Sequence, residues 1–246
     1  MKKILVIGES CLDIFVYCDA NRLCPDMPVP VLSVLRQTQN EGMAMNVQRN
    51  IRGLVSDCGI YTNKNWRNIT KTRYIHEHTN HMFIRIDTDH SVQRANLKYL
   101  DLNYELVVIS DYNKGFLTEE DIEQICTQHN NVFIDTKKIL GKWVEGAKYI
   151  KINNFEYENS KNNITSTIHE KLIHTRGGDG CIYQNKVYPV KRVEVKDSSG
   201  AGDSFMSGLV CKYLETKDIV AAIIFANKCA SEVVQHKGVT TIRALQ

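Results

Sequence analysis

Five short, strand-like apolar segments constrain the fold more than any other feature of this chain. They are ILVIG (4–8), LVVIS (106–110), VFIDT (132–136), YIKIN (149–153) and LIHT (172–175). Helix-like segments lie between most of them, and one, TEEDIEQICTQ (118–128), has Thr118 as the expected N-cap with Asp121 three residues later. Apolar strands that alternate with helices are typical of a parallel sheet with helices on both faces. The sequence therefore predicts an α/β fold.

Two other segments have a different pattern. Residues 14–36 and 69–87 place β-branched and aromatic residues at every second position, which is typical of half-exposed strands. Three of the four prolines, at positions 25, 28 and 30, suit an edge strand or a connection between strands. We interpret the two segments as a small β-flap beside the main sheet. There are no repeats or evident linkers, so we expect residues 1–246 to form a single domain that carries this flap.

Composition limits the kinds of partner. A formal net charge of +3, from 31 basic and 28 acidic residues, gives no reason to expect a nucleic acid or a membrane surface as partner. No apolar run has transmembrane length, and ILVIG is too short for the core of a signal peptide, so we expect a cytoplasmic protein. None of the eight cysteines forms a C-x-x-C pair. Buried reduced thiols are favoured over disulfides in such a chain.

A glycine-rich turn, KDSSGAGDSFMSG (Lys196–Gly208), precedes an expected helix that starts near Gly202. The first amides of a helix have no partner within it, and the small residues Gly200, Ala201 and Gly202 let an anion approach them. The helix dipole also favours negative charge there, so the turn suits a phosphate group. Asp203 would then be placed to accept a proton from an attacking hydroxyl. The alternative is an ordinary helix start with an acidic first turn.

The segment DSSGAGDSF resembles the C-terminal signature D-T-x-G-A-G-D of the ribokinase-like, or carbohydrate kinase B, family. This resemblance implies a three-layer α/β/α sandwich with the β-flap as a lid. It also implies ATP and Mg²⁺ as cofactors and a small-molecule sugar or sugar phosphate as substrate. The amides of Gly200, Ala201 and Gly202 would form an anion hole for the transferred phosphoryl group, and Asp203 would be the general base.

Other motifs follow in the order that the family shows. TRGGDG (175–180) resembles the nucleotide loop T-x-G-x-x-G, and NNFE (153–156) resembles the element N-x-x-E, whose glutamate acts on Mg²⁺ through water. The spacing of Asn153 and Glu156 also fits a capping box, which is the structural alternative. Asn227 matches a position that borders the adenine. The ATP-binding residues that the resemblance implies are Asn153, Glu156, Thr175, Gly177, Gly180 and Asn227.

The N-terminal half resembles the sugar-binding half of the family. EGMAMNVQRN (41–50) is similar to G-G-x-A-x-N-V-A, which touches the sugar, and GESCLD carries the aspartate that holds sugar hydroxyls. Arg85 in RID and Lys137 in DTKK are candidate cations for a phosphate on the substrate, although a solvated surface would also explain Lys137. The implied substrate-binding residues are Asp13, Gly42, Asn46, Arg85 and Lys137.

One branch of the family is more similar than the others. NRLCPDMPVPVLSV (21–34) and SDYNKG (110–115) resemble motifs of the heptose 7-phosphate kinases of the ADP-heptose pathway, which supplies lipopolysaccharide. The implied reaction is ATP-dependent phosphorylation of heptose 7-phosphate at its anomeric hydroxyl. A kinase for another sugar, such as a hexose or ribose, and a degenerate kinase that only binds a nucleotide or a partner are the alternatives. Because family members pair their flaps, the resemblance also implies a homodimer.

The chain departs from the family pattern at three places. Glu41 replaces the first glycine of the G-G pair, and Glu9 replaces an aspartate. Only 65 positions (111 − 46) separate Asn46 from Asp111, where family members usually carry a further strand and helix. We therefore expect the chain to pass directly from the segment after Asn46 to the flap.

Overall fold

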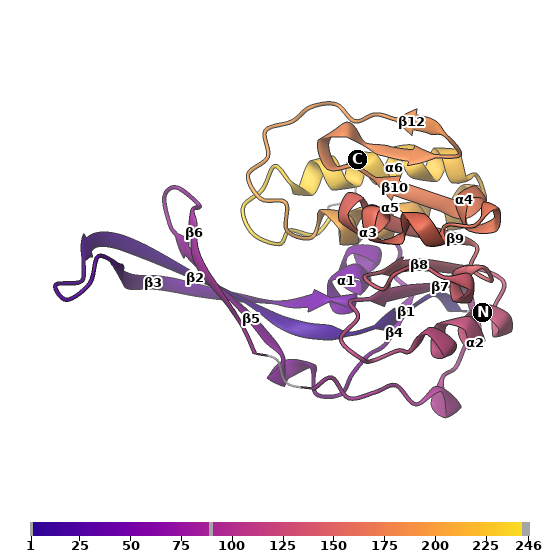
Figure 1. The fold of residues 1–246 in the computed structure, drawn as a ribbon, viewed down its shortest axis with the longest axis horizontal. Helices are drawn as coiled ribbons and strands as arrows, with labels where there is room; N and C mark the ends of the chain where they lie inside the picture. Colours follow the sequence, from indigo (N-terminus) through magenta and orange to yellow (C-terminus); the bar gives the residue numbers. More distant parts are fainter. Residues whose placement is uncertain (1, 89–90, 243–246) are drawn as a thin grey trace.

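The computed structural model describes residues 2–88 and 91–242. Its main sheet has the strand order β12-β11-β10-β9-β8-β7-β1-β4 (Figure 1). The parallel strands are β1 (Lys2–Gly8), β4 (Cys58–Tyr61), β7 (Tyr104–Asp111), β8 (Val132–Thr136), β9 (Tyr149–Asn153) and β10 (Leu172–Thr175). An antiparallel hairpin, β11 (Cys181–Tyr183) and β12 (Lys186–Tyr188), continues one edge. All five predicted strands are present in this sheet.

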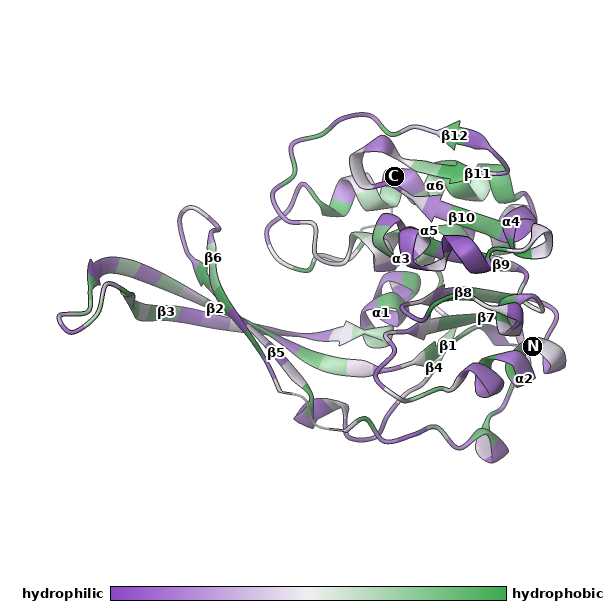
Figure 2. Ribbon diagram, in the orientation of Figure 1, coloured by the Kyte–Doolittle hydropathy of each residue, from purple (hydrophilic) through white to green (hydrophobic). Residues whose placement is uncertain are grey.

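Helices cover both faces of the main sheet. Those on one face are α1 (Ala44–Leu54), α5 (Ala201–Thr216) and α6 (Ile219–Val233); α2 (Glu119–Gln128), α3 (Asn154–Ser160) and α4 (Ser166–Lys171) lie on the other side. Alternate residues of β1 enter different cores: Ile4 and Val6 pack with α5, whereas Leu5 and Ile7 pack with α2. Figure 2 shows these strands as mostly apolar. The predicted three-layer α/β/α sandwich is confirmed.

The sequence signal at α2 is realised in the structure. The Thr118 hydroxyl accepts a hydrogen bond from the amide of Asp121, and the Asp121 carboxylate accepts one from the amide of Thr118. Two backbone donors at the start of the helix are thereby satisfied. Substituting such a cap by alanine typically costs about 1 kcal/mol.

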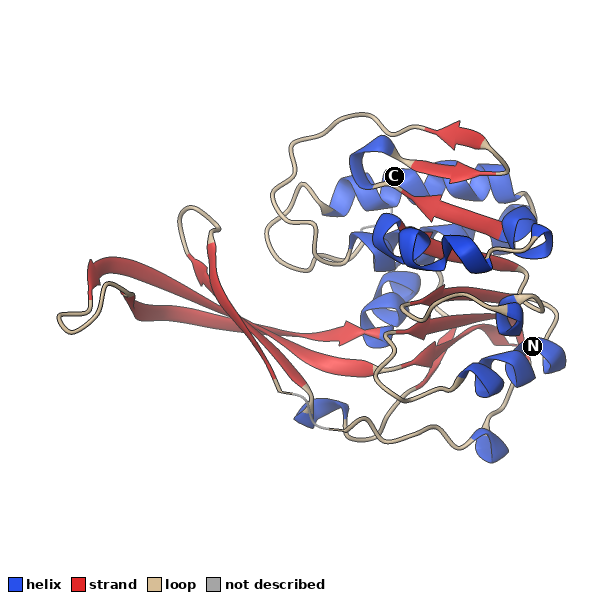
Figure 3. Ribbon diagram, viewed as in Figure 1, coloured by secondary structure: helices blue, strands red, loops and turns tan. Residues whose placement is uncertain are grey.

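A second sheet extends away from the helix-covered body (Figures 1 and 3). Its strand order is β3-β2-β5-β6, formed by β2 (Ser10–Leu23), β3 (Pro30–Met43), β5 (Thr70–His76) and β6 (Met82–Asp87). This sheet, called the flap below, contains the alternating segments at 14–36 and 69–87. Both β2 and β3 are longer than the sequence indicates, because they continue to the main body at Ser10 and Met43. Proline begins β3, which is an edge strand as the proline content suggested.

The segment between Asn46 and the flap differs from the expectation. A short strand, β4, forms there and pairs with β1, so the chain does not pass directly to the flap. After the flap, residues 91–103 form an irregular segment with one short helical turn, η2 (Leu97–Tyr99). Its apolar side chains pack against the core beneath β1 and β7, namely Val92, Ala95, Leu97, Leu100 and Leu102. An irregular segment therefore helps to cover this side of the sheet.

All eight cysteines are free thiols, and all except Cys24 are buried. The preference for reduced thiols over disulfides is thus confirmed. Among the described residues, no helix is long and apolar enough to cross a membrane.

Candidate active site

The glycine-rich turn lies at the start of α5 and requires glycine at its first position. Gly200 is the N-cap, with a φ of 82° in the left-handed region, which residues with a side chain rarely adopt. A Cβ at this position would lie 3.1 Å from Nδ2 of Asn46. Asp197 fixes the preceding loop, because its carboxylate accepts hydrogen bonds from the amides of Ser199 at 2.8 Å and Gly238 at 3.1 Å. The turn is therefore held in place before any ligand binds.

Asp203 lies in the first turn of α5 and is buried, with 8% of its surface exposed. The Tyr112 hydroxyl donates to its Oδ1 at 2.7 Å, and Nδ2 of Asn46 donates to its Oδ2 at 2.7 Å. Burial raises the pKa of the Asp203 carboxyl above its ordinary value, and these two hydrogen bonds oppose the rise. A carboxylate with a raised pKa is a better proton acceptor than an exposed one.

The backbone amides at the start of α5 differ in their partners. The amide of Ala201 donates to the carbonyl of Ser198 at 3.2 Å, so it is engaged within the turn, although the sequence predicted it as part of the anion hole. The first bond of the helix runs from the amide of Ser204 to the carbonyl of Gly200 at 2.9 Å. The amides of Gly202 and Asp203 precede that bond, so they are donors of the kind that a helix leaves for an anion. The structure thus places a buried carboxylate beside a helix start of the kind that suits an anion.

A buried ion pair lies beside this turn and was not predicted from the sequence. Nζ of Lys151 on β9 is 2.7 Å from Oδ2 of Asp135 on β8, and both side chains are at least nine-tenths buried. A Cβ on Gly202 would lie 3.0 Å from the same Nζ, so the ammonium group is adjacent to the turn. A lysine in the middle of the apolar strand YIKIN is the signal that sequence reasoning missed.

A groove of about 820 Å³ extends from the turn across the ends of β9 and β10. Asp203 and the three residues Gly200, Ala201 and Gly202 line one end. Five of the six predicted ATP-binding residues line the rest, namely Asn153, Thr175, Gly177, Gly180 and Asn227. The walls add apolar residues, Val190, Val193, Val195 and Val234, and cations, Lys137, Lys151, Arg176, Lys191 and Arg192. Such a groove suits a ligand with one flat apolar end and one anionic end.

The loop after β10 depends on glycine. Gly177 and Gly180 have φ values of 57° and 81°, and a Cβ on Gly180 would lie 2.1 Å from the carbonyl oxygen of Tyr188. Asn227 on α6 is buried and donates to that same carbonyl at 3.0 Å. Thr175 donates from its hydroxyl to the carbonyl of Ile152 at 3.1 Å. These residues shape the groove, and their contact with a nucleotide stays a prediction.

Glu156 is the predicted ATP-site residue that does not line the groove. It forms the capping box of α3 with Asn153, whose amide donates to Oε2 of Glu156 at 2.7 Å. It is also paired with the ammonium group of Lys137. The structural alternative for Asn153 and Glu156 is therefore realised, and the role toward Mg²⁺ stays a prediction. Lys137 lines the groove, so it lies on the side of the predicted nucleotide site.

The predicted sugar-binding residues lie where the flap meets the main body. Asp13 accepts a hydrogen bond from Arg73 at 2.8 Å, and a Cβ on Gly42 would lie 2.3 Å from Oδ2 of Asp13. Glycine therefore lets β3 pass close to this carboxylate. Asn46, already in contact with Asp203, accepts from Arg49 at 2.9 Å. The structure thus links Asn46 directly to the candidate base.

Arg85 is already paired with a carboxylate of its own strand. It lies on the exposed strand β6 and makes a two-bond ion pair with Asp87, at 2.6 and 2.7 Å. Its partner across the sheet is Arg73. Because a carboxylate already occupies its guanidinium group, its contact with a substrate phosphate stays a prediction.

The two glutamates that depart from the family pattern have distinct positions. Glu41 pairs with Leu12 in the flap, so strand alternation directs its side chain to the face opposite Asp13. Glu9 is fully buried, and its carboxylate accepts hydrogen bonds from the amides of Tyr112 and Lys114, both at 2.8 Å. Glu9 therefore holds the turn that carries Tyr112 toward Asp203.

Known proteins are similar to this chain in sequence and in fold. The profile of pfkB family carbohydrate kinases matches residues 48–244. A curated relative, the bifunctional protein HldE of Helicobacter pylori strain J99, is 30% identical over 300 aligned positions, which cover 97% of this chain and 64% of the relative. The chain thus spans less than two thirds of that relative's length. The alignment has more positions than the 246 residues of the chain, so it contains gaps in this sequence.

Solved structures share the fold at low identity. The ribokinase of Thermotoga maritima superimposes with a TM-score of 0.74 at 16% identity, covering 97% of this chain and 95% of the other. The ribokinase of Arabidopsis thaliana, solved in complex with ribose and ATP, has a TM-score of 0.70 at 14% identity, covering 98% and 96%. These likenesses establish the fold of the chain.

Proposed function

The chain belongs to the pfkB family of carbohydrate kinases, and we propose that it transfers the γ-phosphoryl group of ATP to a hydroxyl of a sugar phosphate. Heptose 7-phosphate, phosphorylated at its anomeric hydroxyl, is the leading substrate. The similarity to HldE and the motifs SDYNKG and NRLCPDMPVPVLSV support this choice. The use of ATP and the free cysteine thiols suit the cytoplasm.

The position of Asp203 at one end of the groove carries the proposal. ATP would lie along the groove with its adenine against the apolar wall and its γ-phosphate at the turn. Asp203 would accept the proton of the attacking hydroxyl, and the amides of the turn and Lys151 would stabilise charge on the transferred group. Phosphoryl transfer depends mainly on such positioning and charge stabilisation.

The residues at the groove also fit Mg²⁺. Asp135 lines the groove, and its buried Oδ1 has no hydrogen-bond partner among the residues that the structure describes. Mg²⁺ prefers oxygen ligands and is usually held by one or two carboxylates, substrate phosphates and water. Asp135, together with Glu156 through water, would hold the ion, which would neutralise phosphate charge when bound.

The proposal is tested by ADP release. The purified chain, with ATP and Mg²⁺, is offered heptose 7-phosphate, fructose 6-phosphate, ribose 5-phosphate and the three corresponding free sugars. We expect the highest kcat/KM with heptose 7-phosphate. Highest turnover with free fructose or ribose would favour the kinase for another sugar. ATP binding without turnover on any sugar would favour the degenerate kinase instead.

Substitution of Tyr112 by phenylalanine tests the environment of the base. The lost hydroxyl is a donor that lowers the pKa of Asp203, so its removal should raise that pKa further. Asp203 must be ionised to accept a proton, so acidification abolishes activity. In the Tyr112→Phe variant this loss should occur at a higher pH than in the wild type. The measurement is the acid limb of kcat/KM against pH. Tyr99→Phe, at an exposed position, is the control; an unmoved acid limb in Tyr112→Phe would contradict the assignment.

We also propose that the flap forms a homodimer. Exposed apolar side chains lie on its edge strands and connections, including Val34, Leu35, Met82, Ile84 and Ile86. Apolar side chains exposed on edge strands often pair with another chain. We expect a dimer by sedimentation at micromolar concentration and a monomer for the variant Ile84→Lys, Ile86→Lys. A monomeric wild type would contradict this proposal without affecting the kinase proposal.

A further inference from the structure

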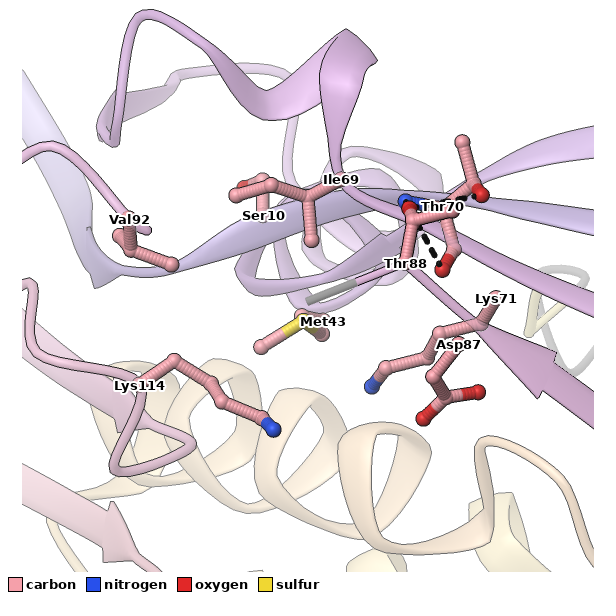
Figure 4. A pocket seen from close by; sticks show the side chains of 9 residues that line it. All are labelled: Ser10, Met43, Ile69, Thr70, Lys71, Asp87, Thr88, Val92 and Lys114. Atoms are coloured by element: carbon pink, nitrogen blue, oxygen red, sulfur yellow. Dashed lines mark hydrogen bonds between the residues drawn. The ribbon is translucent and has the colours of Figure 1, made fainter. Parts of the chain in front are cut away.

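A small pocket of about 40 Å³ lies between the flap and the turn that follows β7 (Figure 4). Its volume corresponds to roughly three water molecules, which is close to the space that the outer oxygens of one phosphate group need. Two lysines from separate parts of the chain line it, Lys71 on β5 and Lys114 in SDYNKG. Figure 4 shows the two ammonium groups directed into the same space.

Lys71 is placed by the register of the flap. Its cross-strand neighbours are Asp13 on β2 and Asp87 on β6. It forms no ion pair with a carboxylate in the described part of the chain, and its ammonium group lies 5.2 Å from the centre of the Tyr112 ring. Asp13 and Asp87 are instead paired with Arg73 and Arg85. Among the described residues of this cluster, namely Asp13, Asp87, Arg73, Arg85 and Lys71, the positive charge of Lys71 is therefore the one without an ion pair.

Lys114 is placed by a buried carboxylate. Its amide donates to Oε1 of Glu9 at 2.8 Å, and Glu9 also accepts from the amide of Tyr112. This fixes the backbone of the turn, so Lys114 reaches the pocket from a rigid position. The same turn carries Tyr112 to Asp203, so the pocket and the base lie at opposite ends of one held segment.

Three hydroxyl groups and three apolar side chains, Met43, Ile69 and Val92, make up most of the remaining lining. Ser10, with 1% of its surface exposed, is joined to the hydroxyl of Thr62 at 2.7 Å. Thr70 and Thr88 are joined at 3.0 Å, as Figure 4 shows. Asp87 is the one described acid in the lining, and Arg85 holds both of its oxygens. Two ammonium groups that line one small pocket beside hydroxyl groups suit a compact anion.

We propose that this pocket binds the phosphate group that the sugar substrate already carries, with Lys71 and Lys114 as its cations. This inference rests on the proposed kinase function and makes a phosphorylated sugar the preferred substrate class. Tyr112 separates the pocket from Asp203, so the bound phosphate and the reacting hydroxyl lie at different ends of the sugar. Lys71 and Lys114 replace Arg85 and Lys137 in this role, because neither of the latter lines the pocket.

The test compares Lys71→Met and Lys114→Met with Lys98→Met, which removes an exposed lysine outside both sites. Each variant is assayed with heptose 7-phosphate and with free heptose, and ATP is varied separately. We expect KM for the sugar phosphate to rise by roughly 10- to 100-fold in the first two variants, which is the usual value of a hydrogen bond to a charged group. KM for ATP and kcat/KM for free heptose should stay within about threefold, since neither ligand uses the pocket.

Binding is measured in parallel by calorimetry with heptose 7-phosphate in the absence of ATP. A wild type that binds the sugar phosphate through Lys71 but does not turn it over would support the pocket and overturn the kinase. A wild type that turns over sugar phosphates, with Lys71→Met and Lys114→Met no weaker than Lys98→Met, would overturn the pocket and leave the kinase intact. Lys71→Arg retains the charge and should recover most of the affinity; failure to do so in a folded variant would also count against the pocket.

Discussion

Replacing Asp203 by asparagine should lower kcat by roughly 10²–10⁴-fold, the usual contribution of a positioned general base. The two side chains have nearly the same shape, and an asparagine can keep both contacts of Asp203. Its oxygen would accept from Asn46, and its amide would donate to the hydroxyl oxygen of Tyr112. The fold and the affinity for ATP should therefore remain, so that the loss reflects proton transfer alone.

The same substitution should stabilise the protein at neutral pH. Because burial raises the pKa of Asp203 in the folded state, the folded protein binds this proton more tightly than the unfolded chain does. The contribution of the carboxyl to stability is then greatest below its unfolded pKa and is lost as pH rises through the folded pKa. At neutral pH the wild type must keep a charged carboxylate buried, whereas Asp203→Asn carries no charge there. The Tm of the variant should therefore exceed that of the wild type most at neutral pH, and the difference should shrink in acid.

Kinetics and melting curves together check this prediction, with Asp179→Asn as a matched control because Asp179 is an exposed acid of the same groove. The control should show neither the fall in kcat nor the rise in Tm. A kcat for Asp203→Asn within a few-fold of wild type would reduce Asp203 to an ordinary acid at a helix start. A Tm below that of wild type at neutral pH would show that the buried carboxylate is stabilising.

Local patterns were sufficient for the parts of the fold that local physics determines. A buried parallel strand is a continuous apolar run, so β1 and β8 are visible in the sequence, and the N-cap of α2 is visible in Thr118 and Asp121. The strand β4 is not, because it has only four residues, one of them glycine, and pairs with a single neighbour. Its formation depends on the edge that β1 offers.

In the candidate site, too, some features are visible in the local sequence and others depend on the fold. The turn at 200–203 was predicted because glycine spacing and a helix start are adjacent in sequence. The Lys151–Asp135 pair arises from neighbouring strands whose residues are 16 positions apart, and the Lys71–Lys114 pocket from a flap strand and a turn. The lysine in YIKIN is a local signal for one member of the first pair, but its partner Asp135 is set by sheet register, and the meeting of Lys71 with Lys114 is set by the register of the flap and the hydrogen bonds of Glu9. Site residues that the fold brings together from distant parts of the sequence can be identified only from the three-dimensional structure.

Replacing Gly202 by valine should lower kcat by roughly 10²–10³-fold or more, the usual effect of losing a donor of an oxyanion hole. The substituted Cβ would lie 3.0 Å from the Lys151 ammonium group, and the two methyl groups beyond it would occupy the space before the amides. The transferred phosphoryl group could then approach neither the Lys151 ammonium group nor the amides of the turn. Gly202→Ala adds only the Cβ, and a lysine side chain can move away from it, so the loss there should be smaller.

Glu215→Val provides the control for this last prediction, because it puts the same β-branched residue on the exposed end of α5. Glu215→Val should lower Tm by the amount that a valine costs in this helix, while kcat stays unchanged. If Gly202→Val melts near Glu215→Val but has lost turnover, the loss belongs to the turn as an anion-binding site. A folded Gly202→Val with nearly full kcat would mean that the phosphoryl group does not meet these amides, and the catalytic position would have to be sought elsewhere in the groove.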